Sequence, residues 1–383
     1  MMQTVLLTLG RLPKALDLAR GFSRAGHRVI VAEPHRHHLA GASRHVARSV
    51  VVTAPSASAE TYLQDLMEVI RAERVDLIVP VSEEILHVSR LAPRLPSNVR
   101  LFAMPHEILL ALHDKHRFIE LCGRFGLAAP ASFAFADPQA AQLAARCDTV
   151  IKPVYSCSGR GLRYAARGTA LPAADPAGSG RGSIVQARID GQVLSSFSIA
   201  RAGRPLGTVV YRGVVMSGSV AVCFERLPIH PAIERWVEQF IHLSTFDGFI
   251  SFDFVEDHDA RPWAIECNPR ATSGLHFVHG EDLAAAVLRP GSVTSLRTRP
   301  ERLLQQFYPC LTETQRSLFH DRSRFRSNLR ALWRARDVTW DRSDPWPFVS
   351  MPATSLPIIR DSIRRGCTFG EIATLDVGWY SDV

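Results

Sequence analysis

Short apolar runs alternate with helix-like segments over the first part of the chain. Residues 4–9 form an apolar run, residues 12–25 repeat apolar positions at helical spacing, and residues 28–32 are apolar again. The alternation continues through residues 49–52, 59–73, 76–80 and 99–103. Strands that alternate with helices in this way predict a parallel sheet with helices on both faces. We therefore expect residues 1–112 to form an open α/β domain.

From residue 113 onward, strands dominate the pattern. A helix is predicted over residues 115–125, then a strand that ends at Lys152 and a Gly-rich loop. Further strands are predicted over residues 183–189, 193–200, 206–215, 219–226, 248–255 and 262–267. Residues 167–182 are rich in Ala, Gly, Pro and Ser, which indicates a surface loop. This succession predicts an α+β domain built on antiparallel strands.

A third region covers residues 293–383. Its apolar positions predict one helical face, formed by Leu318, Phe325, Leu329, Leu332 and Trp333, with many arginines elsewhere. We expect a packed amphipathic helix with a solvated basic face, and favour this over a nucleic-acid or membrane-surface role. The Pro- and Trp-rich residues 344–357 are expected to be irregular chain on the surface.

Composition and charge narrow the class of protein. A length of 383 residues with 46% hydrophobic content indicates two or three folded domains. No apolar run approaches the roughly 18 residues needed to span a bilayer, and the first ten residues lack a basic leader, so we expect a cytoplasmic protein. Seven cysteines without a C-x-x-C pair indicate reduced thiols. The net charge of +8 is spread along the chain, so acidic small molecules such as nucleotides explain it at least as well as nucleic acid.

Three features of the first domain are candidates for ligand binding. Its first turn, residues 10–13, reads GRLP and not G-x-G-x-x-G, which argues against dinucleotide binding. Glu83 and Glu84 follow a strand end, where open sheets bind ligands, although a helix start favours carboxylates as well. The histidines of residues 35–38 are expected to be solvated, with a substrate contact left open.

Three oxygen-bearing side chains are predicted to converge near the end of the second domain. Residues two apart on a strand point the same way, so Glu266 and Asn268 share a face. Asp253 projects alone among apolar neighbours, and a hairpin turn at residues 257–259 would bring it beside them. Such hard oxygen donors favour Mg²⁺, with Mn²⁺ as the alternative ion. The competing interpretation is a polar strand edge, which a central apolar strand tolerates at a cost.

A lysine and a Gly-rich loop form the second constellation. Lys152 ends a strand, and residues 156–161 (SCSGRG) allow backbone N–H groups to approach phosphate oxygens closely. The loop lacks the G-K-[ST] ending of a P-loop, and an ordinary hairpin loop remains the alternative. Asp114 and Lys115 open a helix, and residues 184–191 form a strand that ends in a Gly turn.

The order and spacing of these motifs resemble the ATP-grasp superfamily, of the carboxylate-amine ligase type. The matching motifs are D-K-x-x-F (114–118), K-P (152–153), the Ser/Gly loop (156–161), V-Q-x-x-I-x-G (185–191), Asp253 and E-x-N-P-R (266–270). The last two resemble the metal triad of the D-alanine-D-alanine ligase branch, and the first domain resembles the pre-ATP-grasp domain. The resemblance implies a pre-ATP-grasp α/β domain (1–112), an ATP-grasp domain of two α+β subdomains (113–292, lid about 113–187) and a C-terminal extension (293–383).

The resemblance also implies a role for each matching residue. Lys115 and Lys152 would contact the ATP phosphates. The loop that would close over the phosphates contains Ser158, Gly159, Arg160 and Gly161. The adenine hinge contains Gln186, Ala187 and Ile189, and the magnesium ligands are Asp253, Glu266 and Asn268. Arg270, with Arg212 as a second candidate, would stabilise the acyl phosphate or the tetrahedral intermediate.

The hinge departs from the family pattern where the ribose would bind. Ala187 stands where a glutamate is usual, and Gln192 replaces the glutamate of the later G-x-E. Asp190 is the candidate substitute for ribose recognition. Cys157 and Cys267 are not expected to be nucleophiles, because the implied reaction needs no enzyme thiol.

The implied reaction is ATP-dependent ligation of a carboxylate to an amine through an acyl phosphate, with release of ADP and phosphate. The cofactors would be ATP and Mg²⁺, and the substrates small molecules bound between the first two domains and under the C-terminal region. The alternatives are an ATP-grasp phosphotransferase or carboxylase-like enzyme, and a nucleotide-binding regulatory module without turnover. An acidic carrier protein and a homodimer stay open, whereas a membrane partner is not expected and nucleic acid is not favoured.

Overall fold

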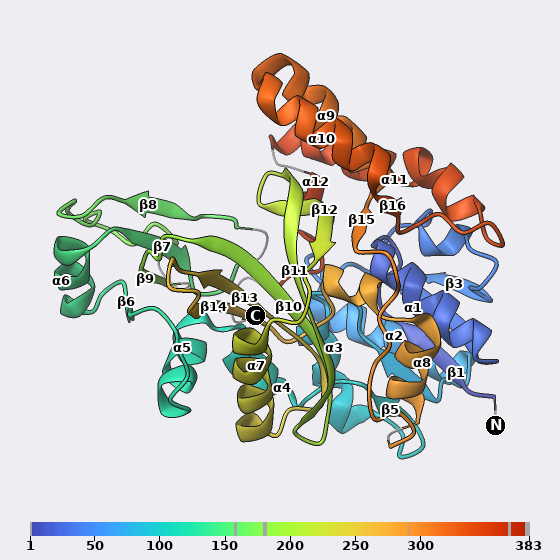
Figure 1. Ribbon diagram of the computed structural model, residues 1–383. Helices are drawn as coiled ribbons and strands as arrows, with labels where there is room; N and C mark the ends of the chain where they lie inside the picture. Colours follow the sequence, from blue (N-terminus) through green and yellow to red (C-terminus); the bar gives the residue numbers. More distant parts are fainter. Residues whose placement is uncertain (1, 157–158, 179–181, 290, 367–368, 380–383) are drawn as a thin grey trace.

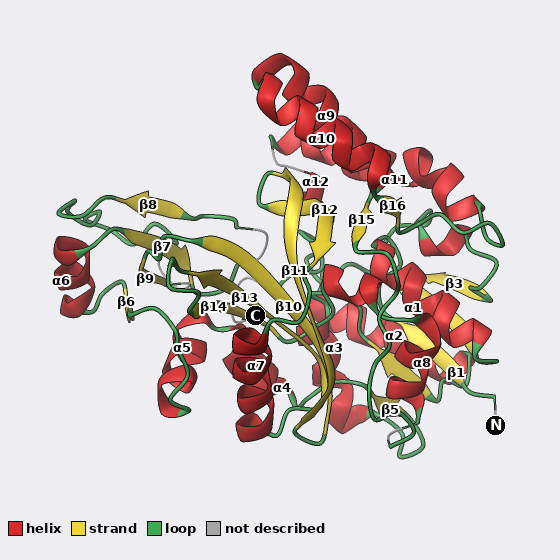
Figure 2. Cartoon of the chain, viewed as in Figure 1, coloured by secondary structure: helices red, strands yellow, loops and turns green. Residues whose placement is uncertain are grey.

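The computed structural model describes residues 2–156, 159–178, 182–289, 291–366 and 369–379. Cys157 and Ser158, two of the residues singled out in the Ser/Gly loop, lie outside the described residues. Figure 1 shows three sheets, with a helical hairpin that projects from the body at the top of the view. Figure 2 shows that helices cover the N-terminal sheet on both sides, as the alternating pattern predicted.

The N-terminal domain is a five-stranded sheet in which every pair is parallel, in the order β3-β2-β1-β4-β5. The strands are β1 (Thr4–Leu7), β2 (Arg28–Glu33), β3 (Arg48–Val51), β4 (Leu77–Val79) and β5 (Arg100–Leu101). The helices are α1 (Pro13–Arg24), η1 (Ala40–Ala42), α2 (Ala59–Ala72), α3 (Ile85–Val88), η2 (Ser89–Arg94) and α4 (His106–His113). The predicted open parallel α/β fold is confirmed.

Alternate residues of the central strand β1 pack into two different hydrophobic cores, one on each face of the sheet. Val5 and Leu7 of β1 pack with Phe22 of α1 on one face of the sheet. Leu6 packs on the other face with Tyr62 of α2. Each buried large apolar side chain contributes about 1.5–3 kcal/mol, so burial on both faces explains why these strands read as continuous apolar runs.

A four-stranded antiparallel sheet, which we call the lid sheet, follows in the order β6-β9-β7-β8. It contains β6 (Ser132–Ala134), β7 (Thr149–Pro153), β8 (Arg163–Ala165) and β9 (Ser183–Ala187), with α5 (Lys115–Arg124) and α6 (Pro138–Arg146) beside it. At the left of Figure 1 it stands apart from the N-terminal domain. Lys152 lies at the C-terminal end of β7, as the sequence predicted.

The largest sheet has seven strands in the order β14-β13-β10-β11-β12-β15-β16. They are β10 (Gln192–Arg201), β11 (Arg204–Ser217), β12 (Val220–Arg226), β13 (Gly248–Glu256), β14 (Pro262–Asn268), β15 (Leu303–Gln305) and β16 (Arg336–Asp337), antiparallel except for the β15–β16 pair. The associated helices are α7 (Pro231–Ser244), η3 (Ser273–Phe277) and α8 (Gly280–Leu288). Two strands of this sheet therefore come from the C-terminal region.

Aromatic packing fixes which face of β13 carries polar groups. The rings of Phe252 and Phe254 lie 5.0 and 5.1 Å from the Trp236 ring of α7, measured between centroids. Side chains alternate along a strand, so Asp253 between them points to the opposite face. The apolar neighbours thus determine the direction of this carboxylate.

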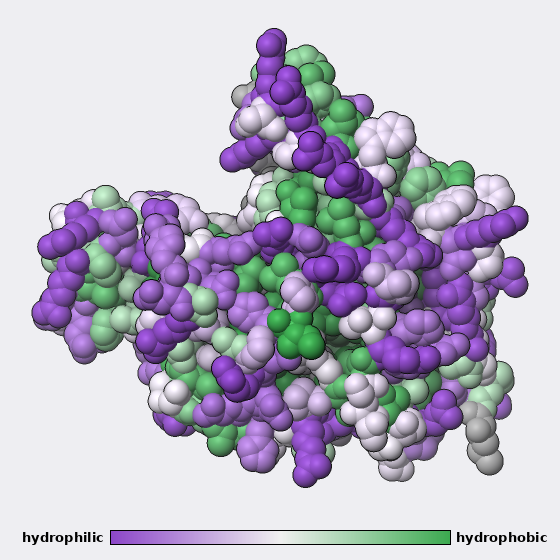
Figure 3. Space-filling model, in the orientation of Figure 1, coloured by the Kyte–Doolittle hydropathy of each residue, from purple (hydrophilic) through white to green (hydrophobic). Residues whose placement is uncertain are grey.

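The C-terminal region differs from two expectations. It forms a hairpin of two helices, α9 (Phe307–His320) and α10 (Arg322–Arg334), because Asp321 caps α10 by accepting from the backbone N–H groups of Ser323 and Arg324. The prediction of a single packed helical face was therefore wrong. Leu318 belongs to α9 and is 45% exposed, and Trp333 on α10 is 82% exposed. In Figure 3, hydrophilic side chains extend from this hairpin.

The second difference lies at residues 344–357, which were expected to be irregular. Most of them form α11 (Trp346–Arg365), and the short α12 (Phe369–Ile372) follows. Pro347 occupies the first turn of α11, where no N–H is needed. Pro352 and Pro357 lie on its exposed side, where water can bind the carbonyl groups that these prolines leave free.

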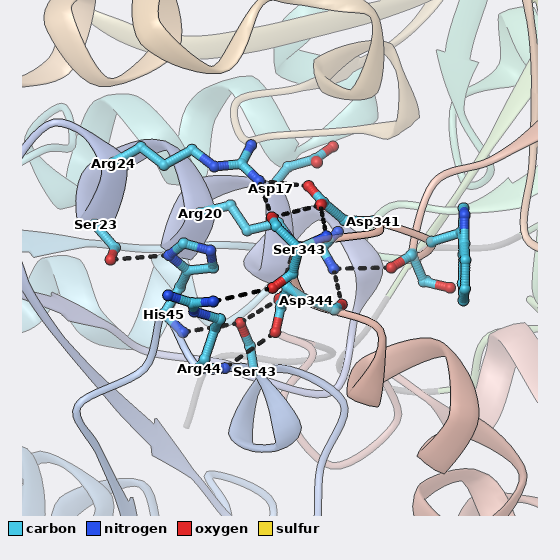
Figure 4. Close-up of polar contacts among 12 residues, drawn as sticks. Asp17, Arg20, Ser23, Arg24, Ser43, Arg44, His45, Asp341, Ser343 and Asp344 are labelled. Carbon is cyan, nitrogen blue, oxygen red and sulfur yellow. Dashed lines mark hydrogen bonds and ion pairs between the residues drawn. The ribbon is translucent and has the colours of Figure 1, made fainter.

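A buried ion pair ties the C-terminal region to the N-terminal domain (Figure 4). Arg20 of α1 donates to Asp344 Oδ2 at 2.9 Å and to the Thr339 carbonyl oxygen at 2.9 Å. Asp344 also accepts from the Ser43 hydroxyl at 2.6 Å and from the Arg44 backbone N–H at 3.1 Å. These charged hydrogen bonds fix the segment before α11 against α1.

None of the helices in the described part of the chain has both the length and the apolarity needed to cross a bilayer.

Candidate functional site

The hairpin of β13 and β14 brings the three predicted metal ligands together. Asp253 pairs with Glu266 in the antiparallel register, and the Asn268 side-chain amide donates to Asp253 Oδ2 at 3.0 Å. The turn closes at the predicted place, with the Asp257 N–H donating to the Arg261 carbonyl oxygen. All three side chains therefore meet on one face of the hairpin.

The electrostatics of this group fit a divalent cation. Loss of water contact and the neighbouring Glu266 carboxylate together raise the pKa of Asp253 to about 6, against the hydrogen bonds from Ser195 and Asn268. Two carboxylates that disfavour each other's charge are a suitable ligand pair for Mg²⁺. The described residues hold no cluster of three or more His, Cys, Asp or Glu side chains, so the other ligands would be the Asn268 amide, phosphate oxygens and water.

Two buried lysines lie opposite these carboxylates. Lys115 Nζ is 3.4 Å from Glu266 Oε1 and donates to the Ser156 carbonyl oxygen at 2.9 Å. Burial lowers the pKa of Lys152 to about 8, an effect that the Glu266 charge opposes. The sequence places Lys115 here because Asp114 caps α5, accepting from the N–H groups of the next turn. Lysines and carboxylates thus balance one another in one small space.

The strand expected to hold an adenine runs beside Lys152. Gln186 of β9 accepts from Lys152 Nζ at 2.6 Å and donates to the Ser132 hydroxyl at 3.0 Å. Ala187 pairs through its backbone N–H with the Ala131 carbonyl oxygen. The Gln186 side chain therefore sets the position of the Lys152 ammonium group.

Past the end of β9, the candidate ribose residue lies at the surface. The Asp190 side chain is 84% exposed, and its carboxylate lies 3.7 Å from the His258 ring on the β13–β14 turn. Ile189, the last hinge candidate, is half-buried. Neither residue forms a described contact with the lysine and carboxylate group. The residues predicted to contact phosphate are therefore brought together, whereas those predicted to contact the ribose are not.

The Ser/Gly loop approaches the strand that carries Lys152. Gly159 and Gly161 both have left-handed backbone conformations, with φ of 65° and 74°. A Cβ atom on Gly161 would lie 2.7 Å from Pro153 Cγ, so only glycine allows this close approach. Arg160 lies between them and faces a cavity described below.

Arg270 connects the hairpin to the N-terminal domain. Its guanidinium group forms an ion pair with Glu83 and donates to Asn268 Oδ1 at 2.9 Å. Burial would raise the pKa of Glu83, but the Arg270 charge overrides it and lowers the pKa to about 2. Glu84 instead accepts from the Val81 and Ser82 N–H groups, which fits the helix-start interpretation of the acidic pair. The ligand interpretation of the pair stays a prediction.

Arg212, the second catalytic candidate, has another partner. Its Nε and Nη2 atoms donate to Glu225 Oε2 at 3.0 and 2.7 Å, across the β11–β12 pair.

Ser195 on β10 is a residue that the sequence did not single out, although its hydroxyl donates to Asp253 Oδ1 at 2.6 Å. A lone serine in an apolar strand carries no distinguishing signal. Lys14 was also missed as a structural link, and it donates to the Ala271 carbonyl oxygen at 2.6 Å.

A cavity of about 610 Å³ lies next to the Ser/Gly loop. One side is formed by Ser156, Arg160 and Gly161, and the other sides come from the N-terminal domain and from α11 to the C-terminal segment. The cavity lies where the substrate pocket was expected, and its use by a substrate stays a prediction. The volume is in the range typical of small-molecule sites.

Comparison with known proteins identifies the fold. No family model matches the chain, and no curated protein sequence matches it. The biotin carboxylase domain of 2-oxoglutarate carboxylase from Hydrogenobacter thermophilus, solved with MgADP and bicarbonate, aligns with a TM-score of 0.63 at 14% identity, over 78% of this chain and 73% of that one.

Two further solved structures are similar over most of their length. N5-carboxyaminoimidazole synthetase from Staphylococcus aureus aligns with a TM-score of 0.62 at 11% identity, over 84% of this chain and 86% of that one. L-amino acid ligase from Bacillus licheniformis aligns with a TM-score of 0.58 at 15% identity, over 79% of each chain. The chain has the ATP-grasp fold, preceded by a pre-ATP-grasp domain.

Proposed function

We propose that this ATP-grasp chain is an ATP-dependent ligase that activates a substrate carboxylate as an acyl phosphate for attack by an amine. The observation that carries the proposal is the group of two buried lysines, two partly buried carboxylates and one buried amide that α5, the lid sheet and the β13–β14 hairpin bring together. Such a concentration of charge is costly without a ligand, and MgATP supplies the matching charges.

The chain's own residues account for each part of the phosphate site. Lys115 and Lys152 would bind phosphate oxygens, and the Ser/Gly loop would close over them with its backbone N–H groups. A magnesium ion held by Asp253, Glu266 and Asn268 would neutralise phosphate charge during transfer to the carboxylate. The work of the site is largely positioning and charge neutralisation.

Arg270 would act at the next step. It lies beside the metal group, and the buried ion pair with Glu83 holds it there. A guanidinium group in this position would stabilise the negative charge that develops when an amine attacks the acyl phosphate. The amine forms the new C–N bond, phosphate leaves with the electron pair of the C–O bond, and the amine loses a proton.

The named activities of the similar proteins support small carboxylate and amine substrates. One is an L-amino acid ligase, and another was solved with MgADP and bicarbonate. A carboxylase-like reaction is therefore the second candidate. The two differ in products, because a ligase joins an organic acid to an amine, whereas a carboxylase-like enzyme needs bicarbonate.

A product-resolved mass-spectrometric screen would test the proposal. The full chain is incubated with MgATP and a matrix of acids and amines, with and without bicarbonate. We expect ADP, phosphate and a condensed product only where acid and amine are both present. Bicarbonate-dependent product would favour the carboxylase-like reaction, and ADP release without any coupled product would reject both.

A further inference from the structure

The cavity beside the Ser/Gly loop has a second end, which the phosphate chemistry does not use. This distal end is formed by Arg11 and His35 of the N-terminal domain and by Ile358, Asp361 and Asp376 of the C-terminal region. The C-terminal segment is held firmly there. The Ser56 N–H donates to the Asp376 carbonyl oxygen at 3.0 Å, and nearby apolar side chains are buried.

Arg11 is already neutralised by carboxylates. Its Nε donates to Glu33 Oε1 at 2.8 Å, and its Nη1 donates to Asp376 Oδ1 at 2.7 Å. Glu33 is buried and also accepts from the Gly10 N–H at 2.8 Å. The guanidinium group therefore faces two carboxylates, and it leaves no excess positive charge in this part of the cavity.

Negative charge is in excess at the Arg11 side of the distal end. Burial lowers the pKa of His35, and Arg11 lowers it further, so the ring is neutral near pH 7. Around Arg11, the two carboxylates of Glu33 and Asp376 outnumber the one guanidinium group. Asp361 on α11 shares the cavity wall with Arg365, and Arg160 lines the side of the Ser/Gly loop. A cationic group is the ligand that balances this end.

Asp361 is the cavity carboxylate whose interaction with the described residues is only electrostatic, with the His35 ring, whose pKa burial lowers and Asp361 raises. Its side chain forms no hydrogen bond or ion pair with any residue in the described part of the chain. It lies one helical turn after Ile358 on α11, and Ile358 packs with Ile372 and Leu375. An acidic group thus stands beside an apolar surface in the wall of a cavity.

We propose that the distal end of this cavity binds a substrate that carries an ammonium group beside an apolar body, with Asp361 as the partner of the ammonium group. The apolar body would contact Ile358, Ile372 and Leu375. The role of the bound molecule as a substrate rests on the proposed function, whereas its binding at Asp361 does not.

Calorimetric titration of the full chain would test the binding site. The protein is saturated with Mg²⁺ and a non-hydrolysable ATP analogue, then titrated with 3-methylbutylamine and with its neutral isostere 3-methyl-1-butanol. A charged hydrogen bond contributes enough to favour the amine by at least about tenfold in affinity. Asp361→Asn should abolish that preference, whereas Asp259→Asn, on an exposed turn, should retain it.

Equal affinity for the amine and the alcohol, or a preference that survives Asp361→Asn, would overturn the inference. Turnover separates this result from the proposed function. Amine binding through Asp361 without ADP formation from any acid would reject the ligase and leave the binding site standing. Ligase activity that is unchanged by Asp361→Asn for every amine would reject the binding site and leave the ligase standing.

Discussion

The Ser195 hydroxyl donates a 2.6 Å hydrogen bond to Asp253 Oδ1, from β10 to the neighbouring strand β13. The other oxygen of the same carboxylate accepts from the Asn268 amide at 3.0 Å. Asp253 is therefore held at both oxygens before any ligand binds. Fixed ligands of this kind reduce the reorganisation that metal binding requires.

Loss of the Ser195 hydroxyl should weaken the metal site. We expect Ser195→Ala to lower the Mg²⁺ affinity of the nucleotide-bound chain by about tenfold, the lower end of the effect of removing such supporting groups. The measurement is Mg²⁺ titration by calorimetry in the presence of ADP. Ser198→Ala, which removes a hydroxyl of the same strand bonded to Thr208, is the matched control. Equal losses in both variants would show a general effect on the strand.

The chain should take up a proton on Lys152 when it binds nucleotide above pH 8. Burial lowers the pKa of Lys152 to about 8, so the free ammonium group loses its proton as the pH rises through 8. A bound phosphate favours the charged form and would restore the proton. Calorimetry at pH 8.5 in buffers of different ionisation enthalpy should show this uptake, and Lys152→Met should remove it. Buffer-independent binding heats at pH 8.5 would contradict the assignment.

Removal of Arg270 should destabilise the chain as well as inactivate it. Arg270→Ala leaves the Glu83 carboxylate buried without its partner, a change that typically costs about 3–5 kcal/mol. The double variant Arg270→Ala/Glu83→Gln should recover part of this loss, because no uncompensated charge remains. Denaturant-induced unfolding measures the free energy of unfolding of the single and the double variant. A double variant no more stable than the single one would exclude the buried charge as the cause.

The same pair predicts an acid limit of stability. The pKa of Glu83 falls from its usual 4.5 to about 2 in the folded chain, so its contribution is complete above pH 4.5 and is lost as the pH falls toward 2. Unfolding free energies of wild type and Glu83→Gln should therefore converge between pH 4.5 and 2. A constant difference over that range would contradict the depressed pKa.

The contact between Arg20 and Asp344 should hold the C-terminal region in place. Asp344→Ala removes the buried partner of Arg20 and should cost about 3–5 kcal/mol of unfolding free energy. Asp341→Ala removes the partner of Arg24, which is 48% exposed, and should cost about 0–1 kcal/mol. Similar losses in the two variants would argue against a specific role for the buried pair.

The sequence predicted the sheets well because their patterns follow directly from burial. Continuous apolar runs marked the parallel strands, and Asp253 was found because its neighbours Phe252 and Phe254 are so strongly apolar. Family motifs then supplied the meaning of Lys115, which lies at an ordinary helix start. The phosphate end of the candidate site could thus be proposed before its geometry was known.

Contacts between distant segments could not be predicted in the same way. Glu83 and Arg270 are 187 positions apart, by subtraction of their numbers, and neither flanking sequence indicates the other. The C-terminal region was misread because the cap at Asp321 splits one apparent face, and because the prolines of α11 lie on its exposed side. Asp361 became a candidate only when the fold placed it in a cavity wall.

Turnover of MgATP by the Lys115–Glu266 group tests the central claim most directly. The measurement is ADP formation by the full chain with an acid and an amine that yield product, compared between wild type, Glu266→Gln and the surface control Asp259→Asn. We predict that ADP formation requires both substrates, that it persists in Asp259→Asn, and that Glu266→Gln abolishes it. Wild-type ADP formation that does not depend on the acid and the amine, or a Glu266→Gln variant that forms ADP at the wild-type rate, would contradict the account.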